Sequence, residues 1–223
     1  NRGALVEMDL ETLEVKARYP LPGDELQHEL GSVAAADDGT TYVIDRKAAT
    51  VYLKAPGSDQ LVSFFTNPEL TGLTDIAVAG DNSKVFVSDS AKGVLVIDPV
   101  SEEAAFLSGP DTMNLGGILG IEYSDGKLFV IQGGFQPQRV VRLELDGESG
   151  LTVKSISPMA TGQDGFDRPG VATIRGDNLY YYANSGATGE TGAIVFSTPL
   201  DAGVEVAPPD MSPLQDAVRA KSQ

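Results

Sequence analysis

The sequence contains no cysteine and only one histidine, His28, among 223 residues. The lack of cysteine excludes disulfides, thiolate metal sites and a cysteine nucleophile. A single histidine leaves little room for a histidine-based metal cage. Without a second histidine or a cysteine, nothing around His28 indicates a nucleophilic triad. Several common kinds of catalytic centre are therefore disfavoured from composition alone.

Basic residues are scarce, because 16 Lys and Arg stand against 32 Asp and Glu, which gives a formal net charge of −16. This charge repels nucleic acid and anionic membranes, so we expect no nucleic-acid partner. No stretch approaches the roughly 18 apolar residues of a membrane span, which predicts that the chain has none. The lack of cysteine together with the acidity favours a periplasmic or secreted bacterial protein, although cytosolic proteins can share this composition.

Helical patterns are absent before the last few residues. Only Pro213 to Lys221 has helical spacing, with Leu214 and Val218 four positions apart. A parallel α/β sheet would require helical segments between its strands. The sequence therefore predicts an all-β fold, followed by a tail at 211–223 that is either a short helix or disordered.

An internal repeat accounts for most of the chain. Four segments, beginning at Ser32, Asp75, Leu119 and Gly170, each contain an apolar run, a tight turn and a second apolar run. Asp-Gly pairs and Gly-Asp-Asn triplets at the turns supply the residues with positive φ that hairpins need. The second runs end at Asp45, Asp89 and Gln132, which are about 44 residues apart.

Each copy continues with a third apolar run, and most copies close with a weaker fourth one. Four short strands in every 40–50 residues are typical of a β-propeller. The first runs, such as Val33–Ala36 and Ile76–Ala79, are small and apolar, which suits inner strands packed between neighbouring blades. We therefore predict a β-propeller with four full blades within residues 1–210.

A leading half blade is also predicted, because residues 4–10 and 15–21 have the patterns of a third and a fourth strand. Half a blade cannot close a ring, and propellers normally avoid exposed sheet edges by closure. We therefore expect residues upstream of Asn1 to complete a ring of six blades. The alternative is that a protein partner pairs with the open propeller edge.

Four stretches carry a family resemblance: Asp-Gly-Lys-Leu-Phe-Val-Ile-Gln-Gly-Gly at 125–134, Gln-Arg-Val-Val-Arg-Leu-Glu-Leu at 138–145, Phe-Asp-Arg-Pro at 166–169 and Asn-Leu-Tyr-Tyr-Tyr-Ala-Asn-Ser at 178–185. Over nearly its whole length the chain resembles the gluconolactonase and regucalcin-like six-bladed propellers, especially their bacterial exported members. The resemblance implies one divalent cation in the central funnel, held by a glutamate, two asparagines and an aspartate. Such a calcium, magnesium or manganese ion polarises a lactone carbonyl and activates water.

This chain departs from the implied ligand set. The positions of the family's asparagines fall near Gly31 or Ser32 and near Thr74 or Asp75, and the expected aspartate falls on Leu119. The glutamate would precede Asn1. Only Asp75 is a plausible metal ligand, so we expect no cofactor unless an altered cation site is rebuilt around it.

The ends of the second strands carry the candidate ligand-binding residues. Symmetry would bring polar groups to one level of the propeller, as a small-molecule site requires. The alternative is that these side chains cap strand ends and turns. Arg168, in a long loop with Phe135 and Phe166, belongs either to a recognition patch or to a packed anchor of that loop. The candidates are Asp45, Arg46, Asp89, Gln132, Arg168 and Asn184.

These observations favour a non-enzymatic propeller that binds a small molecule or a protein at its loop face. The competing hypothesis is a metal-dependent hydrolase of lactones or similar esters, in which Asp45, Asp75 and Asp89 form an altered cation site. A third possibility is an architectural subunit whose open edge pairs with another chain.

Overall fold

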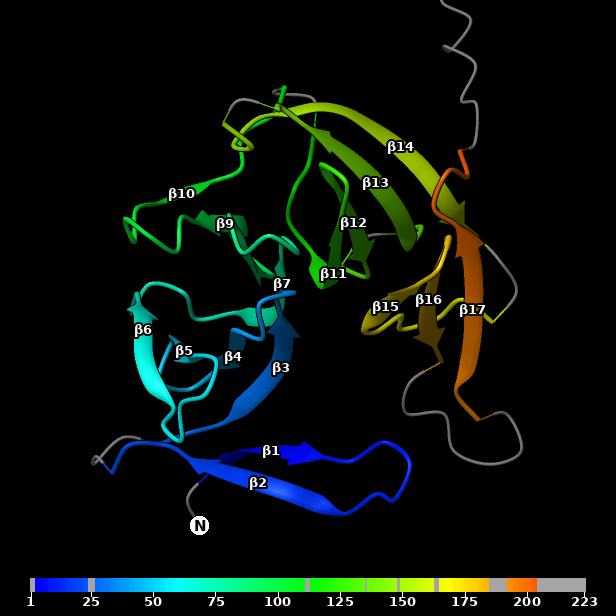
Figure 1. Ribbon diagram of the computed structural model, residues 1–223. Helices are drawn as coiled ribbons and strands as arrows, with labels where there is room; N and C mark the ends of the chain where they lie inside the picture. The colour runs from blue at the N-terminus through cyan, green and yellow to red at the C-terminus, as the bar shows by residue number, and fades with distance from the viewer. Residues whose placement is uncertain are drawn as a thin grey trace, which may run out of the picture.

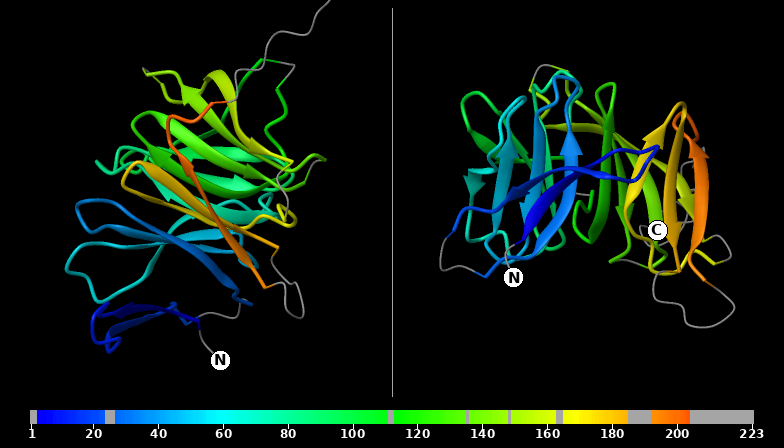
Figure 2. Two further views of the ribbon diagram at one scale, coloured as in Figure 1. Left: turned by 90° about the vertical axis from the view of Figure 1, so that its right-hand side faces the viewer. Right: turned by 60° about the horizontal axis from the view of Figure 1, so that its bottom comes forward.

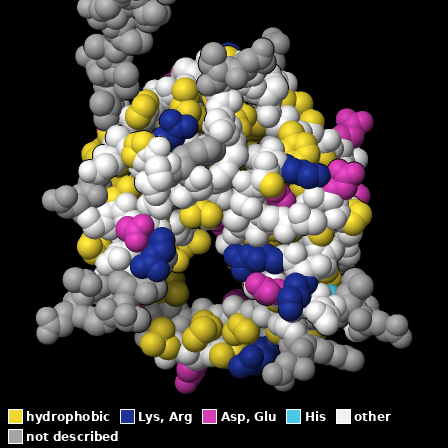
Figure 3. Space-filling model, turned by 180° about the vertical axis from the view of Figure 1, so that it is seen from behind, with side chains coloured by type: hydrophobic (Ala, Val, Ile, Leu, Met, Phe, Trp, Pro, Cys, Tyr) yellow, Lys and Arg dark blue, Asp and Glu magenta, His cyan; other side chains and the backbone are white. Residues whose placement is uncertain are grey.

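The computed structural model describes residues 3–23, 27–110, 113–134, 136–147, 149–162, 165–184 and 192–203. All regular secondary structure in these ranges is β-strand, so they contain no helix that could cross a membrane. The strands form antiparallel sheets that surround a central opening (Figures 1 and 3). The chain is therefore an all-β propeller, which confirms the prediction from the repeat.

Three of these sheets have four strands each, which pair in the order in which they follow one another in the chain. Blade 1 contains β3 (Leu30–Ala35), β4 (Thr41–Asp45), β5 (Thr50–Lys54) and β6 (Val62–Thr66). Blade 2 contains β7 (Leu73–Val78), β8 (Val85–Asp89), β9 (Gly93–Ile97) and β10 (Ala104–Phe106). Blade 3 contains β11 (Ile118–Ser124), β12 (Lys127–Gln132), β13 (Arg139–Leu145) and β14 (Val153–Thr161).

The two remaining sheets are smaller in the described part of the chain. Blade 4 has three strands, β15 (Ala172–Arg175), β16 (Asn178–Ala183) and β17 (Ile194–Pro199). The half blade is the hairpin of β1 (Ala4–Met8) and β2 (Val15–Pro20), as the sequence predicted. Figure 2 shows this hairpin lying beside blade 1 as a separate layer. The predicted tail at 211–223 lies outside the described residues.

The cores lie between the blades, because each second strand is apolar on both of its faces. Tyr42 and Ile44 pack toward blade 2, whereas Val43 packs against Tyr19 of the half blade. Phe86 and Phe129 repeat the role of Tyr42 toward blades 3 and 4, and these three aromatic side chains are fully buried. Blades 1, 2 and 3 are therefore each held mainly by the blades on either side of them.

The inner strands start with a register shift that the sequence alignment did not anticipate. Shifts occur between Leu30 and Val33, between Leu73 and Asp75, and between Ile118 and Gly120. One extra residue opposes the partner strand at each shift, as in a β-bulge. The pairing places Gly120, rather than Leu119, at the position of Asp75 and Ser32. The repeat equivalence predicted for Leu119 is therefore wrong by one residue.

The same comparison corrects the fourth copy. Leu179 pairs with Ile174 as Leu128 pairs with Tyr123, so counting four residues onward places Ala183 at the position of Gln132. Asn184, which was predicted to be equivalent to Asp45 and Asp89, is one residue farther along the chain. The alignment failed here because the turn at Gly176 has a different length from the turns in blades 1 and 2.

The inner strand of blade 1 lacks the cover that later blades receive. Ile76 and Ile121 are 4% and 1% exposed, whereas Val33 at the equivalent position is 48% exposed. Val33 faces the side of the half blade, which has no inner strands in the described residues. Val33 thus lacks the packing that the preceding blade gives to Ile76 and Ile121.

Candidate functional site

The loop face of the propeller is the end at which β4, β8 and β12 finish and the next outer strands begin. Asp45 and Asp89 occupy equivalent positions there, and both are buried. The Asp45 Oδ1 atom accepts hydrogen bonds from the backbone of Lys47 and Ala48, and Asp89 Oδ1 does the same with Ala91 and Lys92. Both carboxylates therefore hold the turn that follows their strand.

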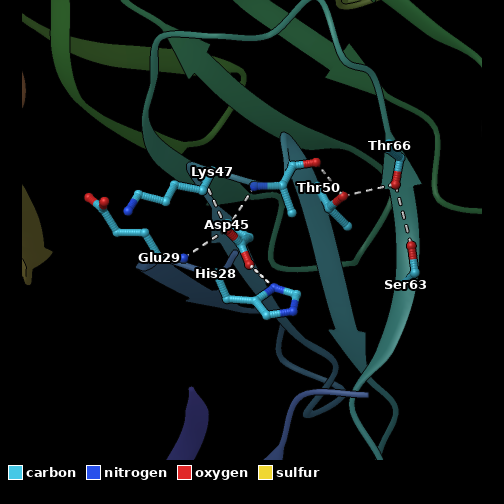
Figure 4. A network of polar contacts seen from close by, with 8 residues as sticks. His28, Glu29, Asp45, Lys47, Thr50, Ser63 and Thr66 are labelled. Carbon is cyan, nitrogen blue, oxygen red and sulfur yellow. Dashed lines mark hydrogen bonds and ion pairs between the residues drawn. The ribbon is translucent and has the colours of Figure 1, made fainter. Parts of the chain in front are cut away.

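Asp45 also makes a side-chain hydrogen bond with the single histidine (Figure 4). The Nδ1 atom of His28 lies 2.7 Å from Asp45 Oδ2, and the Glu29 amide donates to Asp45 Oδ1. Burial acts to raise the pKa of Asp45, but the Glu29 and Ala48 amides and His28 outweigh burial and hold this pKa below its ordinary value. The carboxylate therefore fixes the segment that leads into β3.

Gln132 and Asn184 hold loops in other ways. The amide nitrogen of Gln132 donates to the carbonyl oxygens of Asn114 and Gly116, and its oxygen accepts from Arg139 Nε. The Asn184 side chain donates to the Gly192 carbonyl oxygen at 3.3 Å. The structure thus places Asp45, Asp89 and Gln132 at one level, with contacts to the loops around them.

Arg46 extends from blade 1 to blade 2. Its Nε and Nη2 atoms donate to the carbonyl oxygens of Leu73 and Thr74, both at 3.2 Å. The guanidinium passes over Gly31, where an added Cβ atom would lie 2.9 Å from Arg46 Cζ. Glycine at this position therefore provides the space that the arginine needs.

Asp75 connects three inner strands from a buried position. Its Oδ2 atom accepts from the Ile121 amide of β11, its Oδ1 atom accepts from the Ile76 amide, and Ser32 of β3 also bonds to it. Burial raises the pKa of Asp75, against the opposing effects of these hydrogen bonds and of the Arg46 charge. This residue, predicted as a metal ligand, thus links β3, β7 and β11.

Glu122 is a candidate residue that the sequence analysis missed. It lies on the inner strand β11 and is partly buried, and its side chain makes no hydrogen bond or ion pair with the described residues. Burial, and then the charge of Asp75, raise the pKa of Glu122 to about 7. A correct alignment of the repeats would have singled out Glu122. The strand pairing places Ala34, Ala77 and Thr173 at the equivalent positions, so only this copy carries a carboxylate there.

Arg46, Asp75 and Glu122 are called the axial group below, and Arg168 lies on the loop that leads into β15. It is exposed, its backbone has a φ of 45°, and its Nε lies 3.2 Å from Asp167 Oδ2. The neighbouring Phe166 is buried and packs edge-to-face against Tyr181 and Phe196. Phe166 is thus an anchor of its loop, and Phe135 lies outside the described residues.

The loop face also has a pocket of about 300 Å³ between blades 1 and 2. Arg46 and Lys47 line it together with Pro68, Leu70 and Thr71. A second pocket, of about 400 Å³, lies between blades 3 and 4 at the opposite end of the strands and is lined by Asp125, Asp177 and Asp201. Only the first pocket adjoins the axial group.

The donor set of a cation site is not assembled in the described part of the chain. No group of three or more Asp, Glu or His side chains there could hold a metal ion. Both carboxylate oxygens of Asp75 accept backbone N–H groups, and Leu119 and Gly120 offer no side-chain oxygen. These residues do not fit the cation that the family resemblance implies.

Comparisons with known proteins support the fold. No protein-family model and no curated protein sequence matches the chain. A structure titled as a nidogen/laminin complex is similar over 82% of both chains, with a TM-score of 0.60 and 15% identity. Dihydro-heme d1 dehydrogenase NirN in complex with DHE is similar over 90% of this chain and 40% of its own, with a TM-score of 0.50 and 14% identity. At such identities the likeness concerns the β-propeller fold alone.

Proposed function

We propose that the chain is a non-enzymatic binding propeller that recognises a small molecule or a protein at its loop face. The axial group of Arg46, Asp75 and Glu122 carries this proposal. Its charged side chains come from three consecutive blades, and Asp75 interacts electrostatically with both Arg46 and Glu122. Strands β7 and β11, which carry Asp75 and Glu122, border the central opening (Figure 1). Such convergence of a few fixed polar groups at a hollow is the usual design of a binding site.

Two further features support binding. The turn-capping contacts of Asp45 and Asp89 give the loop face a rigid frame, and loops on a rigid scaffold are where recognition commonly takes place. One of the similar propellers comes from a structure titled as a protein–protein complex. We extend the proposal to a periplasmic or secreted location and to kinship with the gluconolactonase and regucalcin-like group, on the sequence features given above.

The second candidate function is a metal-dependent hydrolase of lactones or esters. It is favoured by one observation, the nearness of the Asp75 and Glu122 carboxylates that is expressed in the raised pKa of Glu122. Against it stands the involvement of both Asp75 oxygens in backbone hydrogen bonds.

Calorimetric titration with calcium, manganese and zinc separates the two functions. We expect no stoichiometric site for any of the three ions, and no lactone hydrolysis in their presence. A tight one-to-one site, or turnover of a lactone, would contradict the binding proposal and favour the hydrolase.

A thermal-shift screen with aliphatic amines, carboxylates and lactones tests binding directly. A compound that binds the axial group should raise the melting temperature of the wild type. The same compound should leave the melting temperature of the Glu122→Gln variant unchanged. Glu103→Gln, in an exposed turn of blade 2, serves as the matched control and should respond as the wild type does. Compounds that stabilise all three proteins equally would count against the axial site.

A further inference from the structure

The hairpin tip of the half blade exposes large apolar side chains. Leu10 is 91% exposed and Leu13 is 68% exposed, and Met8 and Val15 beside them are nearly half exposed. Figure 3 shows hydrophobic side chains gathered along the half blade, at the bottom of that view. We refer to residues 8–15 as the apolar tip. It lies at the end of the strands opposite to the loop face.

The apolar tip is held rigidly. Asp9 Oδ1 accepts from the amides of Glu11 and Thr12, and the Asp9 carbonyl oxygen accepts from the Leu13 amide. Lys16 lies 2.9 Å from Asp9 Oδ2. Main-chain and charged contacts thus fix a turn from which the leucine side chains project without packing on the protein.

The equivalent turn of blade 2 shows that this conformation does not require leucine. Asp98 caps the amides of Val100 and Ser101, and its carbonyl oxygen accepts from the Glu102 amide, as Asp9 does with Leu13. The left-handed residue is Glu102 there, with a φ of 58°, and Leu13 here, with a φ of 59°. In the outer turn of blade 3 this residue is Gly150.

Leucine at position 13 is unfavourable for the stability of the fold for two reasons. A side chain with a Cβ atom is strained at positive φ, and glycine or a short polar residue is the usual solution. An exposed leucine also gains no burial in the folded chain. A backbone strained at Leu13 together with an exposed apolar side chain indicates that this turn contacts another molecule.

Charge identifies the kind of partner. The exposed carboxylates of Glu11 and Glu14 flank the leucines, and neither makes an ion pair with a described residue. The chain as a whole carries a net charge of −16. An anionic membrane or a second copy of this chain would meet like charge, whereas a partner with lysine or arginine around an apolar pocket would be complementary.

We propose that the apolar tip is a docking element for a protein whose binding pocket is apolar and rimmed by basic residues. Leu10 and Leu13 enter the pocket, and Glu11 and Glu14 pair with its rim. This surface is separate from the axial group, so the inference does not depend on the proposed function.

The test uses a phage-displayed random peptide library selected on the immobilised chain, with binding of the enriched peptides measured by calorimetry. We expect peptides that combine apolar residues with lysine or arginine. The double variant Leu10→Ser with Leu13→Gly should weaken them by about tenfold or more. Val100→Ser, in the equivalent turn of blade 2, should bind as the wild type does.

The single variant Leu13→Gly, whose peptide binding is measured beside that of the double variant, separates loss of binding from loss of folding. Because glycine relieves the positive φ, Leu13→Gly alone should raise the melting temperature by about 2–4 °C. Loss of peptide binding in a protein of higher stability cannot arise from unfolding. The proposal is overturned if the selected peptides are insensitive to the double variant, if wild type binds vesicles of anionic lipid through the tip, or if the variant abolishes self-association in sedimentation.

Discussion

Among the described residues, Glu122 has a pKa that is raised well above its ordinary value in the folded chain. It lies on an inner strand, and burial together with the Asp75 carboxylate raises its pKa to about 7, from an ordinary value of 4.5. Between these two pH values the folded state keeps a proton that the unfolded state has released. Glu122 therefore lowers the stability of the fold as the pH rises through this window.

We expect Glu122→Gln to remove this loss of stability at high pH. At pH 8 the variant should be more stable than the wild type by about 2 kcal/mol, and at pH 4.5 the two should be nearly equal. Urea unfolding at both pH values measures the difference. Glu103→Gln, at an exposed turn, is the control and should show no such change between the two. An equal effect of Glu122→Gln at both pH values would show that its charge is not the cause.

The residue scale is also where prediction from sequence was least successful. The polar character of Asp45, Asp89 and Gln132 was evident, but the sequence could not show that their atoms bind the adjoining loops. Glu122 was missed because the hairpin of blade 3 is shorter than those of blades 1 and 2, which makes Gly120, rather than Leu119, the counterpart of Asp75. A register shift of one residue leaves no mark in composition or spacing, yet it exchanges the faces of a strand.

At the scale of elements, the inner strands approach each other closely where their residues are small. A Cβ atom on Gly120 of β11 would lie 3.0 Å from the Gly170 carbonyl oxygen and 3.3 Å from Val171 Cα, next to β15. The equivalent residues Ser32 and Asp75 reach instead toward the next blade, where Ser32 bonds to Asp75 and Asp75 to the Ile121 amide. The junction of blades 3 and 4 thus depends on the absence of a side chain.

Gly120→Ala should therefore destabilise the protein, by about 1–3 kcal/mol, because backbone on both sides of the contact must shift. Gly147→Ala is a matched control, since an added Cβ atom there meets nothing within 4 Å. Chemical denaturation of the two variants gives the comparison. Equal stability of both variants would show that blade 4 moves away from β11 at little cost.

At the scale of the whole molecule, the repeat made the propeller predictable. Hairpin turns and apolar runs recur because each blade needs the same strands, and the described blades follow that pattern. The half blade was also found in the sequence, since an outer pair of strands keeps its alternation without the inner pair. The number of blades in the closed ring stays a prediction.

Hydrogen exchange should reveal how unequally the ring is stabilised. Among the described residues the half blade packs on blade 1 alone, whereas blades 2 and 3 have cores on both faces. We expect the amides of β1 and β2 to exchange at least about a hundredfold faster than those of β8 and β12. Uniform protection across all blades would indicate that the whole ring opens in a single step.

The sequential pairing of strands within each blade has a mechanical consequence. Because each sheet is formed from one continuous stretch of chain, a force applied to the two ends can unravel one blade while its neighbours keep their own hydrogen bonds. With about 44 residues from one blade to the next, each such event releases roughly 150 Å of extended chain. Under tension the propeller would lengthen in steps of nearly constant size.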